Sequence, residues 1–264
     1  MESPKIDYIQ SKDNKTIKHI ISLQQRKYRQ KFGEYTVEGI RAVTDIGKKH
    51  FLRSILIRES KRSELEPLMQ KGFTISSVYV VQDPIFDKIE HSVNGQGILG
   101  IAKKCVNDLH SLIVEDGLYI ALDGVQDPGN LGTIIRTAVA AGAKGIFLLK
   151  GTVDPYNEKC VRSTMSALCN IPIFEDIKLS EFYDFIKDNT IKTYVTSLEN
   201  AKPYHTISYP KRTMIILGNE GNGVSREIIE MCDQAITIPM YGDIESLNVS
   251  IAAALCMYKV REQI

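Results

Sequence analysis

Residues 215–225, IILGNEGNGVS, decide the fold, because a buried strand here runs directly into a glycine-rich loop. Gly218, Gly221 and Gly223 let the backbone turn tightly and approach a ligand closely. A strand that leads through a loop into a helix is the repeating unit of an α/β sheet, and such sheets bind ligands at the carboxyl ends of their strands. The stretch therefore predicts an α/β fold with a ligand site at this loop.

The loop does not have the pattern of the common nucleotide-binding loops. Its glycines do not follow GxGxxG, and GxxxxGK[ST] occurs nowhere in the chain, so dinucleotide-binding and P-loop interpretations are weak. Glu220 would also repel a phosphate placed beside it. The loop instead suits a ligand without phosphates, such as the adenosine and cationic sulfonium of S-adenosylmethionine.

A second strand leads into residues 123–136, DGVQDPGNLGTIIR, where a loop is followed by a helix. Asn130 can serve as the N-cap of this helix, a structural use that does not exclude a functional one. Arg136 lies in the second turn among apolar residues, so its charge requires an anionic partner or a water-filled site. A structural salt bridge is one interpretation, and an arginine that faces phosphate is the other.

A third strand ends in residues 238–250, IPMYGDIESLNVS, ahead of the apolar last helix. Ser246 or Asn248 can cap that helix. Capping explains one of these polar residues and leaves the other, together with Ser250, for a different role.

Strands and helices alternate along the whole chain, which predicts a mostly parallel sheet covered on both faces in the second half. We expect a smaller α/β domain at residues 1–104, a linker at 105–117 and a larger domain at 118–264. The first domain is expected to open with one helix over residues 14–31 and to contain strands at 34–37, 54–57, 77–81 and 97–102.

The basic residues are concentrated in the N-terminal part. Residues 1–110 hold 19 Lys and Arg against 13 Asp and Glu, whereas the remainder holds 14 against 19. A basic half beside an acidic half suggests that one part grips a polyanion while the other carries out chemistry; solvated helix faces are the alternative. The candidate RNA-binding residues are Lys12, Lys15, Lys18, Arg26, Lys27, Arg29 and Arg41.

Several other classes of protein are disfavoured. The five cysteines are widely spaced without a CxxC, which argues against a disulfide framework and a zinc site, and we expect no metal. No apolar stretch is long enough to cross a membrane, and the N-terminus lacks an apolar signal core, so we expect a cytoplasmic protein.

Together the three segments resemble the SpoU (TrmH-like) branch of the SPOUT RNA methyltransferases. The motifs occur in the family's order: NxGxxxR beginning at Asn130, LGxEGxG over Leu217–Gly223, and IPMxGxxxSLNVS over Ile238–Ser250. The N-terminal part, ending in QGILG at 96–100, looks like the ribosomal-protein-like RNA-binding domain that many members carry.

The resemblance implies a parallel α/β sheet whose C-terminal segment threads a trefoil knot, a topology that general folding rules would reject. It implies a homodimer that transfers methyl from S-adenosylmethionine to a ribose 2′-hydroxyl of rRNA or tRNA, and of the two we favour large-subunit rRNA and keep tRNA as the alternative. The cofactor contacts it implies are Gly218, Ile238, Leu247, Thr196, Ser197, Leu217, Gly223 and Met240.

The same resemblance gives the role of general base to Arg136. An arginine resists deprotonation, since its pKa lies above about 12. Our hypothesis is that Arg136 positions a phosphate and lowers the pKa of the ribose hydroxyl, while Asn130, Glu220, Ser246 and Asn248 orient it and the substrate. The rivals are an RNA-binding module without catalysis and a nucleotide-dependent oxidoreductase, the latter disfavoured by the missing fingerprint at the loop.

Overall fold

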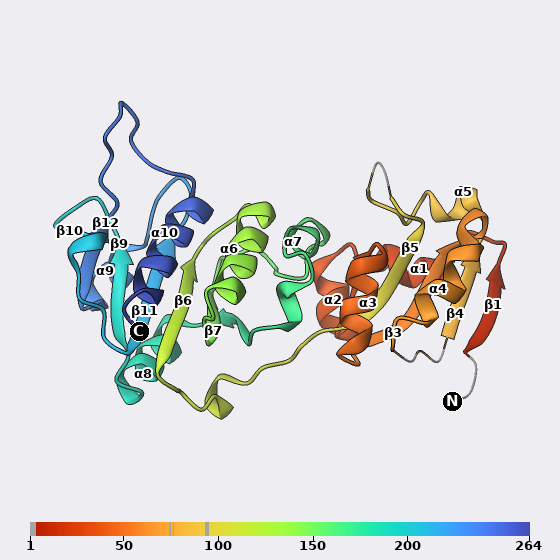
Figure 1. Cartoon of the computed structure of the whole chain (residues 1–264), viewed down its shortest axis with the longest axis horizontal. Helices are drawn as coiled ribbons and strands as arrows, with labels where there is room; N and C mark the ends of the chain where they lie inside the picture. Colours follow the sequence, from red (N-terminus) through yellow and green to blue (C-terminus); the bar gives the residue numbers. More distant parts are fainter. Residues whose placement is uncertain (1–3, 74, 76, 93–94) are drawn as a thin grey trace. The chain divides into compact units, whose positions relative to one another are not determined.

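The structure, a computed structural model, describes residues 4–73, 75, 77–92 and 95–264. The chain divides into two compact units. The N-terminal unit contains Met1–Cys105 and Tyr156–Cys169, and the C-terminal unit contains Val106–Pro155 and Asn170–Ile264 (Figure 1). A separate N-terminal α/β unit was expected from the sequence and is confirmed. The segment Tyr156–Cys169 groups with it, although its sequence position had placed it in the larger domain.

The N-terminal unit is built on a mixed five-stranded sheet in the order β1-β4-β3-β5-β2. β4 pairs in parallel with β1 and β3, whereas β5 pairs antiparallel with β3 and β2. β1 was not predicted, and it is an edge strand with mostly exposed side chains, so its sequence lacks a clear buried face. The strands are β1 (Lys5–Ile9), β2 (Glu34–Glu38), β3 (Leu52–Arg58), β4 (Ser77–Val81) and β5 (Ile98–Lys103).

The single helix predicted over residues 14–31 is wrong in its middle, because the chain forms two helices, α1 (Lys15–Ser22) and α2 (Arg26–Phe32). Arg29 explains the break. This residue is 4% exposed, and its guanidinium donates to the carbonyl oxygens of Leu23 and Gln24 at 2.7 and 2.8 Å. These bonds satisfy carbonyls that the end of α1 leaves without helical partners. Arg29 therefore stabilises the turn, and this structural role stands beside its predicted RNA-binding role, which stays a prediction.

The remaining helical elements of this unit are short and lie between or after the strands. They are α3 (Ile40–Lys48), η1 (Glu59–Glu64), α4 (Leu65–Met69), α5 (Asp83–Phe86), α7 (Glu158–Ser163) and η3 (Ala167–Cys169).

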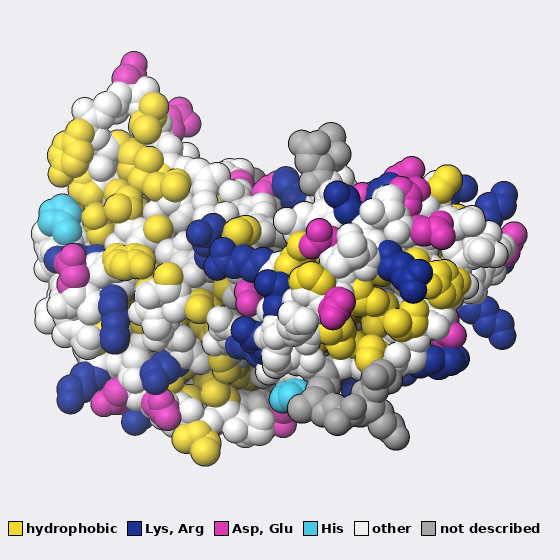
Figure 2. All heavy atoms as spheres, turned by 45° about the vertical axis from the view of Figure 1, so that its right-hand side comes forward, with side chains coloured by type: hydrophobic (Ala, Val, Ile, Leu, Met, Phe, Trp, Pro, Cys, Tyr) yellow, Lys and Arg dark blue, Asp and Glu magenta, His cyan; other side chains and the backbone are white. Residues whose placement is uncertain are grey.

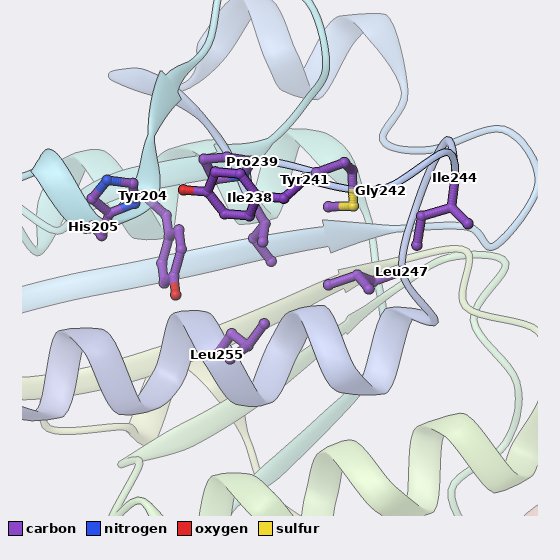
Figure 3. A pocket seen from close by; sticks show the side chains of 10 residues that line it. Tyr204, His205, Ile238, Pro239, Tyr241, Gly242, Ile244, Leu247 and Leu255 are labelled. Carbon is purple, nitrogen blue, oxygen red and sulfur yellow. The ribbon is translucent and has the colours of Figure 1, made fainter.

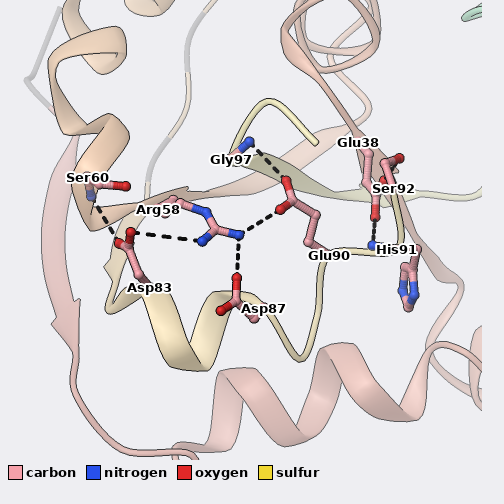
Figure 4. Close-up of polar contacts among 9 residues, drawn as sticks. All are labelled: Glu38, Arg58, Ser60, Asp83, Asp87, Glu90, His91, Ser92 and Gly97. Carbon is pink, nitrogen blue, oxygen red and sulfur yellow. Dashed lines mark hydrogen bonds and ion pairs between the residues drawn. The ribbon is translucent and has the colours of Figure 1, made fainter. Parts of the chain in front are cut away.

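Arg58, at the end of β3, ties the connection between β4 and β5 to the sheet (Figure 4). Its guanidinium lies 2.7 Å from carboxylate oxygens of both Asp87 and Glu90, and Glu90 also accepts from the Gly97 N–H at 2.9 Å. Glu38 accepts the His91 N–H at 2.6 Å on the same connection. Charge-assisted hydrogen bonds thus fix the connection in addition to the burial of Ile85, Phe86 and Ile89 in the core.

The C-terminal unit contains a seven-stranded sheet in the order β10-β12-β9-β11-β6-β7-β8, and every pairing in it is parallel. This confirms the parallel sheet expected from the sequence. The strands are β6 (Gly117–Asp123), β7 (Gly145–Leu149), β8 (Ile173–Ile177), β9 (Lys192–Thr196), β10 (Lys202–Pro203), β11 (Arg212–Gly218) and β12 (Gln234–Thr237). The threading of the C-terminal segment stays a prediction.

Helices cover both faces of this sheet (Figure 1). α8 (Leu179–Asp188) and α9 (Arg226–Met231) pack on one face through Phe182, Phe185 and Ile228. α6 (Pro128–Ala140) and α10 (Val249–Arg261) pack together on the other face, where α10 also contacts β11 and β6. Short turns η2 (Leu109–Ser111) and η4 (Tyr204–Thr206) complete the unit.

No described helix combines the length and apolar character that spanning a bilayer requires. Over the same part of the chain, no three His, Cys, Asp or Glu side chains gather as a metal site would need.

Two cysteines of the N-terminal unit lie in contact. The Cys105 thiol donates to the sulfur of Cys169 at 3.2 Å, and the Tyr35 hydroxyl lies 3.4 Å from the same sulfur. The hydrogen bond from Cys105 lowers the pKa of Cys169 to about 7 although burial opposes the shift, and the Tyr35 hydroxyl and the charge of Lys49 add to the lowering. Cys169 is therefore partly thiolate at neutral pH.

We predict that the alkylation rate of Cys169 by iodoacetamide rises with pH around a midpoint near 7, because the thiolate is the nucleophile. Cys105→Ala removes the donor and should move the midpoint upward. Peptide mass spectrometry over a pH series measures both, with the buried Cys160 as the unreactive control. A midpoint that does not move in the variant would contradict this account of the pair.

Candidate active site

The site lies where neighbouring parallel strands end. β6 and β11 are adjacent, and Asp123 at the end of β6 is in register with Gly218 at the end of β11. The Asp123 carboxylate also accepts the Ser225 N–H, beyond the glycine-rich loop, at 2.8 Å. The loop after β6 and the loop after β11 therefore begin side by side, as the position of the motifs predicted.

The glycine-rich loop after β11 folds back on its own strand. Asn219 and Gly223 exchange backbone hydrogen bonds of 2.9 and 3.0 Å, and Gly223 has a φ of 69°. A Cβ on Gly218 would lie 2.1 Å from the carbonyl carbon of Gly223. Gly218 is thus needed so that two backbone segments can touch.

Asn219 fixes this loop internally and to its neighbour. Its side-chain oxygen accepts from the backbone of Gly221 and Asn222 at 2.9 and 3.0 Å. Its side-chain nitrogen donates to the carbonyl of Gly124, in the loop after β6, at 2.9 Å. The motif drew attention to Glu220, whereas Asn219 is the residue that determines the loop's shape.

Asp127, not Asn130, caps α6. The Asp127 carboxylate accepts the Asn130 N–H at 2.9 Å, and Pro128 occupies the first helical turn. The capping role considered for Asn130 is therefore wrong. Its side chain is left free to make contacts outside the helix.

Asn130 links the other two loops. Its side-chain nitrogen donates to Glu220 at 3.0 Å, and its side-chain oxygen accepts from the Asn248 amide at 3.0 Å. The Asn248 oxygen in turn caps α10, because it accepts the Ser250 N–H at 2.9 Å and the Ser250 hydroxyl at 2.6 Å. Three segments that lie far apart in the sequence thus meet in one hydrogen-bonded chain, Glu220–Asn130–Asn248.

Glu220 is the charged end of this chain. Burial alone would raise its pKa, but hydrogen bonds from Asn130 and from the backbone N–H groups of Gln126 and Asp127 lower it below the usual value. Glu220 is consequently ionised at neutral pH. A carboxylate accepts hydrogen bonds only, so it requires the nitrogen of Asn130 to face it and leaves the oxygen for Asn248.

The other two residues predicted to be catalytic, Arg136 and Ser246, are not hydrogen-bonded to Glu220, Asn130 or Asn248. Arg136 is exposed on α6 and makes no hydrogen bond or ion pair with any residue that the structure describes. The structural salt bridge considered for it is therefore absent within that part of the protein. Ser246 is exposed in the segment between β12 and α10, and its hydroxyl likewise contacts no described polar group.

A cavity of about 360 Å³ lies beside the same segment (Figure 3). The chain from Ile238 to Gly242, with Ile244 and Leu247, forms one side of it, and Leu255 of α10 lies opposite. Tyr204 and His205 of η4 complete the lining. Its volume lies within the range of small-molecule sites and its walls are mainly apolar and aromatic, while Tyr241 and Ile244 leave it open to solvent.

Three of the eight residues predicted to contact a cofactor line this cavity: Ile238, Met240 and Leu247. The other five do not line it. Leu217 is buried in the core, and Gly218 and Gly223 shape the loop after β11. The Thr196 hydroxyl donates to the carbonyl of Ile216 and the Ser197 hydroxyl to that of Glu199.

Tyr204 and His205 were missed from the sequence. They follow β10, which has only two residues, in a stretch without a helical or strand period. The Tyr209 hydroxyl donates to the Tyr204 carbonyl at 2.8 Å, and the Tyr209 ring packs edge-on against Tyr194 of β9. This tertiary anchoring, together with the Gln263 side chain that donates to the Ile207 carbonyl at 3.0 Å, holds the aromatic pair at the cavity, and the local sequence pattern carries no signal for it.

The C-terminal unit is a parallel α/β sheet with a pocket of small-molecule size beside clustered amides at its strand ends. Residues 117–258 match the model of the SpoU rRNA Methylase family, and residues 14–100 match the MRM3-like substrate binding domain. The chain belongs to the SpoU rRNA methylase family, which confirms the resemblance drawn from the three motifs.

Individual relatives cover nearly the whole chain. The 23S rRNA (guanosine(2553)-2′-O)-methyltransferase RlmP of Bacillus subtilis (strain 168) is 33% identical over 256 residues, which is 96% of this chain and 98% of the relative. A putative TrmH family tRNA/rRNA methyltransferase of Staphylococcus aureus (strain COL) is 36% identical over 221 residues, covering 80% and 88%. The AdoMet-bound rRNA methyltransferase of Sinorhizobium meliloti has a TM-score of 0.88 at 30% identity, covering 97% and 98%. S-adenosylmethionine, the cofactor predicted from the sequence, is thus the ligand of a solved relative.

We predict that Gly218→Ala destabilises the C-terminal unit by about 1–3 kcal/mol, because the new methyl group collides with backbone that cannot rotate away. Gly221→Ala is the matched control, since its Cβ would lie 3.5 Å from the Asn219 oxygen, an ordinary contact. Chemical denaturation followed by circular dichroism measures both variants. Equal stability of the two variants would show that the close contact between Gly218 and the backbone of Gly223 is not needed for the loop to fold.

Proposed function

We propose that this protein transfers a methyl group from S-adenosylmethionine to a ribose 2′-hydroxyl of 23S ribosomal RNA. The observation that carries the proposal is the hydrogen-bonded chain Glu220–Asn130–Asn248, which joins the three motif-bearing segments directly next to a cavity for a small molecule. The similarity to the Bacillus subtilis enzyme over both units supports the choice of RNA.

The cavity has the properties that the methyl donor requires. Ile238, Leu247 and Leu255 offer apolar surface against which a flat adenine ring can pack, and Gly242 has open space around its Cα. When bound there, S-adenosylmethionine supplies a methyl group activated by its sulfonium. The residues of this protein have to hold the donor, exclude water and present the ribose hydroxyl in line with it.

Arg136 is assigned to the RNA rather than to the donor. A guanidinium without a partner in the described protein is available to bind phosphate through two parallel hydrogen bonds. Its positive charge beside the ribose would stabilise the developing oxyanion without Arg136 losing a proton itself. The hydroxyl proton would pass to water as the new oxygen–methyl bond forms and the sulfonium becomes a neutral thioether. Asn130, Asn248 and Ser246 supply neutral donors and acceptors that orient the sugar, and Glu220 fixes the direction of the Asn130 amide.

RNA capture is assigned to the N-terminal unit. Five of the residues predicted to bind RNA have exposed side chains, while Arg26 is partly buried and Arg29 is structural. The exposed ones are Lys12, Lys15, Lys18, Lys27 and Arg41. The ion pairs that Lys18 and Arg41 make with Asp13 and Asp45 are at the surface, where such pairs contribute little and can be exchanged for phosphate. Because rRNA is modified where ribosomes assemble, we propose that the enzyme acts in the cytoplasm.

A homodimer is the further part of this proposal, supported by the outer face of α10. Ile251, Leu255 and Tyr258 are 51%, 39% and 50% exposed and repeat at helical spacing, so they form an apolar stripe. Figure 2 shows hydrophobic side chains gathered on the C-terminal unit, below the segment between β12 and α10 that projects from it in Figure 1. A contiguous apolar patch of this kind marks a protein contact, and a second copy of the chain is the occupant we propose.

The test of the function is transfer by the purified protein to 23S rRNA from cells that lack the gene. We expect one new 2′-O-methylated nucleotide, detected by resistance to alkaline cleavage, and guanosine 2553 is the position to examine first. Donor binding without transfer to any RNA would favour a module that has lost catalysis. No binding of S-adenosylmethionine in the presence of RNA would overturn the proposal.

We predict that Arg136→Lys and Arg136→Gln both lower the single-turnover rate, by about 10²-fold or more, because neither replaces a two-pronged donor to phosphate. The affinity for S-adenosylmethionine should stay unchanged, since Arg136 does not line the cavity. Rates are measured across a pH series, with donor affinity from calorimetry as the control. A lysine enzyme that works at nearly full rate would contradict both a phosphate clamp and an arginine base.

We predict that Ile251→Glu converts a dimer into a monomer, because it places a charge in the apolar stripe of both copies. Ile251→Leu keeps the apolar surface and should remain dimeric. Light scattering over a range of protein concentrations distinguishes the two. A wild-type protein that is monomeric throughout would rule out this interface.

A further inference from the structure

The helix α2 of the N-terminal unit carries aromatic rings on its surface that the core does not use. Phe32 is 41% exposed, and Tyr28, one turn earlier, is partly exposed. Their rings are nearly parallel, with an angle of 12° and a distance of 6.1 Å between centroids. An exposed phenylalanine at the end of a basic helix adds little to the stability of the fold. The groups around its ring therefore indicate which kind of ligand it could bind.

The Phe32 ring is held in place by the protein. His19 of α1 packs edge-on against it at 4.8 Å. The His19 ring nitrogen lies 2.6 Å from the carboxylate of Glu34, a residue that is 4% exposed and also accepts from Arg53. Phe32 is therefore positioned before any ligand arrives, which reduces the entropy lost on binding.

Cations surround these rings. The Lys27 ammonium lies 4.8 Å from the Tyr28 centroid and that of Lys31 lies 5.5 Å from the Phe32 centroid. Residues 12–32 contain seven Lys and Arg and one acidic residue, Asp13. Ile21 of α1, 40% exposed, adds apolar surface to the same pair of helices. Figure 2 shows hydrophobic side chains bordered by Lys and Arg on this unit.

Flat rings beside ammonium groups fit a polyanion that carries flat bases. We propose that Tyr28 and Phe32 form a stacking platform for unpaired bases of the substrate RNA, with Lys27 and Lys31 neutralising the adjoining phosphates. This inference rests on the proposed function and adds the recognition of a single-stranded region to it. RNA-binding proteins read such regions by stacking splayed bases on aromatic side chains. In this account the lysines exchange their contact with the ring faces for contact with phosphate when a base stacks.

The experiment measures the affinity of the full-length protein for a fluorescent 23S rRNA fragment around the methylated nucleotide, over a series of salt concentrations. Phe32→Ala and Tyr28→Ala should each weaken binding roughly 5- to 100-fold at every salt concentration and leave the salt dependence unchanged. Lys27→Gln and Lys31→Gln should each reduce the salt slope by about 1, because one phosphate contact is lost. Stacking and charge are thereby separated in one set of curves.

Three controls make the result specific. Phe32→Tyr keeps a ring and should bind as the wild type does, and Ile21→Ala removes exposed apolar surface without removing a ring and should change affinity less than twofold. S-adenosylmethionine affinity should be the same in every variant, because the cavity lies in the other unit. Circular dichroism confirms that these surface changes leave the fold intact.

Wild-type affinity in Phe32→Ala and Tyr28→Ala would overturn the platform, while rRNA methylation by those variants would leave the proposed function standing. A change of oligomeric state in Phe32→Ala, with RNA affinity unchanged, would also overturn it and show that the rings contact protein. A wild type that binds neither RNA nor S-adenosylmethionine would remove the proposed function itself.

Discussion

The amide of Asn130 is the interaction on which the candidate site depends. It donates to Glu220 and accepts from Asn248, so one side chain holds together the segments that follow β6, β11 and β12. Two local features make this geometry available. Asp127 takes the cap of α6 and frees Asn130, and the lack of a side chain on Gly218 lets the glycine-rich loop fold back and present Glu220. A cap and a close backbone contact thus determine the arrangement of polar groups at the strand ends.

The ionised state of Glu220 determines which way the Asn130 amide is oriented. Backbone N–H groups of the loop after β6 and the Asn130 amide together lower its pKa, and the resulting carboxylate accepts from that amide in one orientation only. Asn248 is thereby oriented as well, and through it the first turn of α10. The site is a set of fixed dipoles rather than a set of titrating groups, which agrees with catalysis by positioning and charge stabilisation more than by proton abstraction.

Sequence alone predicted the features that depend on local patterns. The parallel sheet, the order of its elements and the three segments at its strand ends follow from alternating hydrophobic runs and motif spacing. Features that depend on distant partners did not follow. Residues 14–31 read as one helix because the carbonyls that Arg29 binds cannot be seen in the pattern. Tyr204 is held at the cavity by contacts with distant residues, among them the hydrogen bond from Tyr209 to its carbonyl. The contact between Cys105 and Cys169, 64 residues apart, has the same origin.

Arg29 and Arg136 show how a structure separates residues that a sequence treats alike. Both lie in helices, and both were assigned to RNA from the sequence. Arg29 is buried and has both carbonyls it needs, so it is satisfied within the protein. Arg136 is exposed and has no partner among the described residues, so water satisfies it until an anion replaces that water. A phosphate that pairs with Arg136 would displace solvent without breaking any bond to a described residue, and this difference from Arg29 is why we propose Arg136 as the arginine that meets RNA.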